Sequence, residues 1–470
     1  MIAPFPLRKS LTRRAFVSSA SLSAMVTILG VNQVRAQTSA VVELRAQTGS
    51  ARLRGPQQAA TTITGYGGTV PGPTIRVKRG QDINARLINN AAEPTTIHWH
   101  GLRVPNGMDG TPFLTQPPVL PGESFDYRFL AKDAGTFWYH APLVSQLARG
   151  LYGPVIVDEP EPVDVDRDVL LVLDDWNLDP DGSLRAVGSS AASPSEPPLF
   201  TANGQGDLAI AARRGERIRL RLINATVNRL LPISVSNLPC WVVAIDGQPA
   251  EPFIARDSRV MLAPGNRIDL FVDIAEGVGA TVPIMVESGG GQSVQIARFA
   301  IEGGKLLNRL RDAPKSLPHN PVPSRIDLRN AHRAQLALDA ALSSVTPSEG
   351  KKIPKPKAKN SGAGVSWTPM DQLSGPLGPP LFSVRSDRPV ALTFGNPGDQ
   401  AQVIHVHGHT FRLLDNLDDG WKPFWLDTLL VAPQQTARIA FVADLPGKWA
   451  IERRSLSDPA RESLTWFEVT

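Results

Sequence analysis

Cysteine is almost missing from this chain, because Cys240 is the only thiol among 470 residues. One cysteine excludes an internal disulfide framework and any metal site built from several thiolates. Long apolar runs are also scarce: after the first 36 residues, no stretch approaches the ~18 apolar residues of a membrane helix. Outside one lysine-rich loop, basic residues are not interleaved with aromatic ones. We therefore expect neither a membrane span in the rest of the chain nor a nucleic-acid partner.

Glycine and proline, by contrast, are abundant, with 39 and 42 residues, and the hydrophobic fraction is 42%. This hydrophobic fraction excludes a disordered chain, and the many turn formers favour a fold with many turns over a helical bundle. The length exceeds what one hydrophobic core supports and suits roughly two to four domains.

Acidic residues are absent from the first 36 residues, where five basic residues occur: Arg8, Lys9, Arg13, Arg14 and Arg35. The apolar stretch over residues 15–31 is too short and too rich in serine for a membrane span. Residues 34–36 have the small-residue pattern of a cleavage site. Residues 10–16 resemble a twin-arginine export signal, and a Sec-type signal with adjacent arginines is the alternative. We expect residues 1–36 to be a signal peptide that sends the folded chain through the twin-arginine translocon to the periplasm.

The formal net charge of +5 is explained by this first segment. Without its five basic residues, 44 basic residues balance 44 acidic ones. A basic surplus could have indicated binding to nucleic acid or to a membrane surface. Because the surplus lies in the export segment, the rest of the chain is expected to be close to neutral.

An internal repeat organises the remaining chain. One strand pattern occurs three times, at residues 79–89, 214–224 and 386–396. Each copy has apolar side chains at every second position and ends in an asparagine, ten residues after its first position. The alternation predicts a half-buried strand, and asparagine tolerates the turn that follows. A second element, a turn followed by an alternating strand, comes after each copy, at residues 121–129, 264–272 and 433–441.

The repeat length of roughly 110 to 150 residues is typical of a whole β-sandwich domain. Proline-rich joints separate the copies, so we expect an all-β chain with domains at residues 37–160, 161–310 and 325–470. Residues 346–364 are rich in lysine and proline, which predicts an exposed insertion without a partner in the third domain. Leu336, Leu338 and Ala340 alternate, which favours a strand at the start of that domain over a short helix.

Six of the eight histidines fall into three clusters. His98 and His100 begin nine residues after the asparagine of the first copy, and His405 and His407 have the same offset in the third copy. Residues two apart on a strand point to one face, so each pair can present two imidazoles in the same direction. Two such pairs that face each other between related domains would form a four-imidazole site, and His140 could add a fifth ligand.

The donor types narrow the choice of metal. Imidazole suits copper, zinc, nickel or iron, and the lack of thiolates leaves copper and zinc as leading candidates. The alternative is that these histidines are buried and bind only backbone groups through hydrogen bonds. Two histidine pairs at the same position of a repeat make this alternative less favourable than a metal site. His409 has no comparable argument and is expected to support its neighbours.

Several segments are similar to the copper motifs of the multicopper oxidases, a family of three cupredoxin-like domains that includes laccases and bacterial cuprous oxidases. The likeness covers nearly all of residues 40–470 and rests on residues 96–102, 108–110, 135–140, 146–154, 200–205 and 405–411. The resemblance implies three Greek-key β-sandwich domains and an oxidoreductase with copper cofactors. It assigns the metal ligands to His98, His100, His140, His405 and His407.

The resemblance also shows which ligands are missing. Pro142 stands where the second motif has another histidine, and Gln402 stands where the third motif has its first one. The last motif, which in the family is His-Cys-His, reads Glu-Arg-Arg at residues 452–454. Asp458 and Ser463 lie near the places of the remaining blue-copper ligands, and Cys240 in the second domain cannot replace the missing thiolate.

These departures define what remains of the copper sites. A blue-copper centre needs one cysteine thiolate, two histidines and a weak axial ligand, and none of these is present at the expected positions. His98 and His405 match both ligands of the isolated copper, and the other two coppers would share three histidines instead of six. The positive charges of Arg453 and Arg454 are expected to repel cations in a poorly solvated seam.

We therefore predict a periplasmic multicopper-oxidase homologue that binds one copper ion, or two, at the seam between domains one and three, without four-copper oxidase activity. One alternative is a copper or zinc oxidoreductase that uses this remnant site, with Asp109 as a proton relay. The other is a metal-free envelope or cell-division scaffold with a protein partner, because the family includes copper-free, twin-arginine-exported members that support cell division.

Overall fold

The computed structural model describes residues 40–188, 198–236, 238–289, 291–304, 311–338, 367–414 and 421–470. The predicted signal peptide at residues 1–36 and the predicted insertion at residues 346–364 lie outside these residues. Residues 39–470 form one unit. Within the described part of the chain, no helix is long and apolar enough to cross a membrane.

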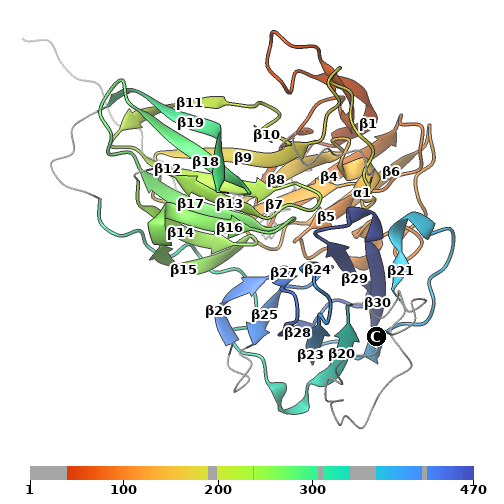
Figure 1. Cartoon of the computed structure of the whole chain (residues 1–470). Helices are drawn as coiled ribbons and strands as arrows, with labels where there is room; N and C mark the ends of the chain where they lie inside the picture. Colours follow the sequence, from red (N-terminus) through yellow and green to blue (C-terminus); the bar gives the residue numbers. More distant parts are fainter. Residues whose placement is uncertain are drawn as a thin grey trace, which may run out of the picture. The chain divides into compact units, whose positions relative to one another are not determined.

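Two four-stranded sheets form the first part of the fold (Figure 1). One sheet has the order β2 (Thr61–Tyr66), β1 (Val42–Ala51), β4 (Asp82–Asn89) and β6 (Ser124–Leu130). The other has the order β3 (Ile75–Lys78), β8 (Tyr152–Asp158), β7 (Gly135–His140) and β5 (His98–His100). Their inward side chains form one hydrophobic core around Trp99, Tyr127 and Phe129.

The second part contains a six-stranded and a five-stranded sheet. The larger sheet has the order β10 (Leu199–Ala202), β9 (Arg167–Trp176), β12 (Arg217–Asn224), β17 (Arg267–Asp273), β14 (Cys240–Ile245) and β15 (Gln248–Ile254). The smaller has the order β11 (Leu208–Arg214), β19 (Gln292–Gly304), β18 (Thr281–Gly289), β13 (Leu231–Val235) and β16 (Arg259–Leu262). A second core of Leu, Ile and Val side chains fills the space between them.

The third part repeats this plan. One sheet has the order β20 (His332–Ala337), β23 (Arg388–Gly395), β28 (Thr436–Ala443), β25 (Phe411–Leu414) and β26 (Trp421–Leu426). The other has the order β21 (Thr368–Pro369), β30 (Ser463–Val469), β29 (Gly447–Ser455), β24 (Gln402–Val406) and β27 (Thr428–Val431), and β22 (Ser383–Val384) also pairs with β30. The strand predicted from Leu336, Leu338 and Ala340 is present as β20 through Ala337, and Ala340 lies outside the described residues.

Helical segments are short. Among the described residues they are α1 (Val144–Leu147), η1 (Asn106–Met108), η2 (Arg256–Ser258), η3 (Leu328–Asn330), η5 (Met370–Gln372) and η6 (Pro459–Arg461). The all-β prediction is therefore confirmed. The domain boundaries at residues 160 and 310–325 stay a prediction.

The three repeated asparagines perform the same task in each copy. Asn89 donates its side-chain N–H groups to two backbone carbonyls, those of Glu93 and Val119, at 2.9 and 2.8 Å. Asn224 and Asn396 bind two carbonyls in the same way. Each side-chain oxygen also accepts the backbone N–H two residues later, at 3.0 to 3.2 Å. We call this arrangement the asparagine clamp; it fixes the end of the strand and the path of the chain toward the next strand.

One of the three repeated strands differs from the prediction of a half-buried strand. β4 has buried residues at every second position, whereas every residue of β12 is buried. Arg219 and Arg221 on β12 form ion pairs with the buried Asp269 at 2.7 and 3.3 Å. Because Arg221 also donates to Thr136 of β7 at 2.9 Å, these arginines form part of the contact between the first and second parts of the fold.

Candidate metal centre

All five predicted ligands lie together. His98 and His100 are on β5, His140 ends β7, His405 is on β24 and His407 follows that strand. Strand pairing sets His98 opposite His140, and all five side chains are almost fully buried. The period-two geometry of each strand thus directs both imidazoles of each pair to the same seam.

His98 and His405 face each other through their Nε2 atoms, which are 3.1 Å apart. The Nδ1 of His98 lies 3.1 Å from the carbonyl oxygen of Asp109, and the Nδ1 of His405 lies 2.9 Å from that of Asp427. A carbonyl oxygen only accepts, so both Nδ1 atoms carry the proton and both Nε2 atoms offer lone pairs. Burial lowers the pKa of His405 to about 4, which keeps its ring neutral. At this distance the two Nε2 atoms share a proton or bind one metal ion between them.

His100 and His140 form a second pair of this kind. The Nε2 of His100 lies 2.9 Å from the Thr428 hydroxyl, and that hydroxyl donates to Asp427 at 2.8 Å, so we assign the proton of His100 to Nε2. The Nδ1 of His140 lies 2.9 Å from the Ala141 carbonyl oxygen and carries the proton of that ring. The remaining nitrogens, Nδ1 of His100 and Nε2 of His140, are 3.3 Å apart. Burial holds the pKa of both rings well below the usual value. Both rings are therefore neutral, and each can offer a nitrogen lone pair to a metal ion.

His407 has different surroundings. Its Nδ1 is 3.0 Å from a carboxylate oxygen of Asp109, and its Nε2 is 3.0 Å from Oε1 of Glu452 without hydrogen-bond alignment. Burial alone would lower the pKa of His407, but the two carboxylates outweigh it and raise the pKa to about 10. His407 is therefore an imidazolium between two carboxylates, and a metal ion would have to displace its proton.

Glu452 also belongs to the site. The sequence did not predict that it contacts the histidines. It lies on β29 directly opposite His405, with 5% of its surface exposed. Burial would raise its pKa, but His407 lowers it well below the usual value, so it is ionised. Its place in the last motif was visible in the sequence, but the pairing of β29 with β24 was not.

Arg453 and Arg454 contribute less positive charge to the cluster than predicted. Adjacent residues of a strand point to opposite faces, and the guanidinium of Arg453 lies 4.9 Å from the centre of the Trp367 ring. Arg454 pairs with Glu462 at 2.6 Å, although its charge still lowers the pKa of His140. Arg454 therefore acts on the cluster from beside Glu462, whose pKa burial raises to about 7.

Asp109, the predicted proton relay, is buried beneath His407 and accepts a hydrogen bond from the Thr111 hydroxyl at 2.6 Å. Burial would raise its pKa, but His407 holds it well below the usual value. The next residue, Gly110, has φ +84°, and a Cβ there would lie 1.8 Å from the carbonyl oxygen of Ile97. Only glycine allows the chain to place Asp109 this close to His98.

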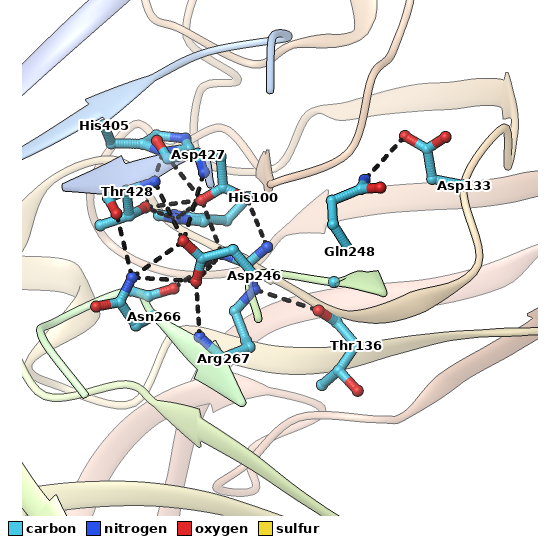
Figure 2. Close-up of polar contacts among 12 residues, drawn as sticks. His100, Asp133, Thr136, Asp246, Gln248, Asn266, Arg267, His405, Asp427 and Thr428 are labelled. Carbon is cyan, nitrogen blue, oxygen red and sulfur yellow. Dashed lines mark hydrogen bonds and ion pairs between the residues drawn. The ribbon is translucent and has the colours of Figure 1, made fainter. Parts of the chain in front are cut away.

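A network of buried carboxylates around Arg267 supports His100 and His405 (Figure 2). Arg267 binds both oxygens of Asp427, at 2.8 and 2.6 Å, and Asp427 in turn holds Thr428 and His405. Asp246 accepts the backbone N–H of Arg267 at 3.1 Å, and burial together with nearby Asp427 raises its pKa to about 7. These residues come from β17, from the turn after β14 and from the start of β27, so only the folded chain brings them together.

The other residues singled out in the sequence lie outside the cluster of donors. His409 points its Nδ1 at the His407 carbonyl oxygen at 3.0 Å and packs against Phe441 and Trp449. Cys240 is buried in the second core, where burial raises its pKa to about 12. This thiol is neither ionised nor near the histidines.

Two sets of three donor atoms each lie within 4.8 Å of one another: His98, His100 and His405, and His98, Asp109 and His407. The two sets share His98. Together with the neutral nitrogens described above, they make this seam the candidate metal centre.

Comparison with known proteins agrees with the fold. Three models described as Multicopper oxidase match residues 48–162, 167–295 and 350–452. Lac15 from a marine microbial metagenome is 31% identical, with a TM-score of 0.74 and coverage of 92% of this chain and 100% of that chain. A multi-copper oxidase from Pseudomonas thermotolerans is 29% identical, with a TM-score of 0.76 and coverage of 92% and 99%.

Among the relatives, the multicopper oxidase MmcO of Mycobacterium tuberculosis is 27% identical over 95% of this chain and 90% of that protein. Copper resistance protein A of Escherichia coli is 30% identical over 54% of this chain and 51% of that protein. The fold and these matches define an all-β protein with cupredoxin-like domains. The chain belongs to the multicopper oxidase family.

Proposed function

We propose that this chain is an exported, periplasmic member of the family that binds one copper ion, or two, at the histidine seam and lacks four-copper oxidase activity. The observation that carries this proposal is the pair of His98 and His405, whose Nε2 atoms face each other at 3.1 Å. This separation suits two nitrogen ligands that each lie about 2.0 Å from one ion.

The donor set fits copper. Imidazole nitrogens are ligands that copper accepts readily, and both Nδ1–H groups are fixed by backbone carbonyls, which is how proteins orient metal-binding histidines. His100 and His140 offer a second, similar pair and account for a second ion. Copper, when bound, supplies one-electron redox chemistry, whereas the residues of this chain hold and orient the ligands.

The residues at the blue-copper positions are the reason to propose that four-copper activity is lost. Gln402, Arg453 and Ser463 supply no thiolate and no imidazole, and Cys240 is buried in another core. Glu452 and Arg454 occupy two further ligand positions, and Glu452 is engaged with His407. A protein of this composition has no blue-copper centre through which electrons could enter.

Metal analysis tests the proposal. After copper loading and desalting, we expect about one copper per chain, with a second ion only at higher copper concentration, and no oxygen uptake with a phenol or with cuprous ion. His405→Ala should weaken copper binding at least tenfold, because it removes one half of the facing pair. His319→Ala is the matched control, because this exposed histidine lies outside the cluster, and it should bind copper like the unchanged protein.

Other outcomes identify the alternatives. Tight binding of zinc in preference to copper would favour the zinc oxidoreductase, for which the mixed imidazole and carboxylate donors are suitable. Oxygen uptake that disappears in His405→Ala would establish a working oxidoreductase at the remnant site. A protein that binds neither metal would contradict the proposal and favour an envelope scaffold with a protein partner.

Export is proposed from the twin-arginine pattern of the first segment. Replacing Arg13 and Arg14 with lysine should keep the chain in the cytoplasm of a producing bacterium, because the translocon recognises the arginine pair. Cell fractionation followed by immunoblotting measures this. As a control, Arg35→Lys makes the same exchange outside the arginine pair and should leave export unchanged. Equal periplasmic amounts of the double lysine variant and the unchanged protein would refute the twin-arginine signal.

A further inference from the structure

A cavity of about 630 Å³ is lined by residues from the segments that lead to His98 and that follow His140. Its wall comes from the segment before β5, the loop that precedes β6, the segment after β7 and the 3-10 helix η5. Five prolines line it, together with Phe113, Leu143 and Met370: Pro94, Pro112, Pro117, Pro118 and Pro142. Concave, mostly apolar cavities of this size are typical of small-molecule sites.

The charged side chains that line this cavity are all acidic. Glu93, Glu123 and Asp371 line it and are exposed, and no lysine, arginine or histidine is among its described lining residues. Glu93 already pairs with Arg149 at 2.5 Å. Glu123 and Asp371 therefore leave a negative potential at the mouth, which favours a cationic group and disfavours an anionic one.

Two lining residues lie close to candidate ligands in the chain. Thr96 comes two residues before His98, and Pro142 comes two residues after His140. At the position of Pro142, the multicopper oxidases have a histidine ligand. In this chain the same position supplies an apolar wall to the cavity, so the substitution that removed a metal ligand also contributed to a surface for an apolar group.

The loop that forms one side of the cavity is well fixed. Phe113 has φ +60°, a conformation that bulky residues rarely adopt, and its backbone N–H donates to the Gln116 carbonyl at 2.8 Å. The Thr115 hydroxyl accepts the backbone N–H of Thr111 at 2.9 Å. Such over-determined backbone is common at ligand sites, and a wall held in place reduces the ordering cost of binding.

We propose that this cavity binds an amphiphilic organic cation, a molecule with an aromatic ring and an ammonium group. The ring packs against the prolines and Phe113, and the ammonium group lies near Glu123 and Asp371. This site is separate from the metal centre, and its occupant needs no metal ion for binding.

Calorimetric titration of the purified, copper-free protein tests the proposal with three probes of similar shape: 2-phenylethylammonium, neutral 2-phenylethanol and anionic 3-phenylpropionate. Removing copper ensures that the amine does not bind as a metal ligand. We expect the ammonium probe to bind at least tenfold more tightly than the alcohol and the carboxylate to bind most weakly. Equal affinities for the three probes, or no binding of any, would overturn the proposal.

Two variants locate the site. Asp371→Lys should weaken binding of the ammonium probe at least tenfold and change binding of the alcohol less than twofold, because it reverses one charge at the mouth. Asp399→Lys is the matched control: this aspartate is also exposed, but it does not line the cavity, so affinity should not change. Equal losses in both variants would show that only net charge matters and would refute the site. Should Asp371→Lys melt at a lower temperature than the control, Asp371→Asn provides the same comparison with a smaller change.

Discussion

Arg267→Met should lower the free energy of unfolding by about 3–5 kcal/mol, because it leaves two buried carboxylates without the positively charged guanidinium that they contact. Arg267 is fully buried and binds both oxygens of Asp427, and Asp246 lies 3.6 Å from its guanidinium. Removing one partner of a buried pair leaves the other charge uncompensated, which costs much more than the pair itself contributes. Urea denaturation of the metal-free protein measures the difference.

A matched pair on the surface provides the control. Arg86 binds both oxygens of Asp126 with the same geometry, but the two side chains are 47% and 62% exposed. Arg86→Met should leave the free energy of unfolding almost unchanged, because solvent screens the interaction. Similar costs for the two variants would show that burial of the Arg267 network is not what stabilises this seam.

The same variant also has a consequence for metal binding. Asp427 orients His405 through its carbonyl oxygen and holds Thr428 against His100. Loss of outer partners of this kind typically weakens metal binding 10- to 100-fold. We therefore expect Arg267→Met to weaken copper binding by a similar factor, with Arg86→Met unchanged.

His407 should make the stability of the metal-free protein depend on alkaline pH. Its pKa is about 10 in the folded chain and 6.5 in the reference state, so the folded state binds the proton more tightly. The stabilisation from this proton is fully present below about pH 6.5 and is lost as pH rises through 10. The loss over this interval amounts to about 3–5 kcal/mol. His407→Gln removes this contribution, so its stability deficit relative to the unchanged protein should shrink as the pH rises.

His332→Gln is the control for this experiment, because burial lowers the pKa of His332 instead of raising it. Its difference from the unchanged protein should stay constant between pH 8 and pH 10. Denaturant midpoints at pH 6.5, 8 and 10 for the three proteins are sufficient. A deficit of His407→Gln that does not vary with pH would show that His407 is neutral in the folded state.

The features of this molecule that could be predicted from the sequence are those that depend on patterns of residues close together in the chain. Strand alternation and the threefold repeat predicted the all-β fold, and the equal offset of two His-x-His pairs predicted that their imidazoles could meet. Both patterns depend only on residues close together in the chain and on the two-residue period of a strand. The ligand assignment itself stays a prediction until metal is measured.

The parts that could not be predicted depend on contacts between distant segments. Arg267 and Asp427 are 160 residues apart, and neither lies in a histidine motif. Glu452 meets His407 only because β29 pairs with β24. The direction of Arg453 was open to prediction from strand alternation, but this needed the knowledge that residues 447–455 form a strand in which Glu452 points inward.

The asparagine clamp occurs in all three copies, including the second, where Ile233 and Val235 stand in place of the histidine pair. The frame that carries the imidazoles is thus built without reference to any ion. Changes at ligand positions leave this frame in place even where they alter stability, so a chain of this fold can lose redox centres one residue at a time and keep the same architecture. The glutamate, arginine and proline at former ligand positions are what such stepwise loss would leave behind in a stable protein.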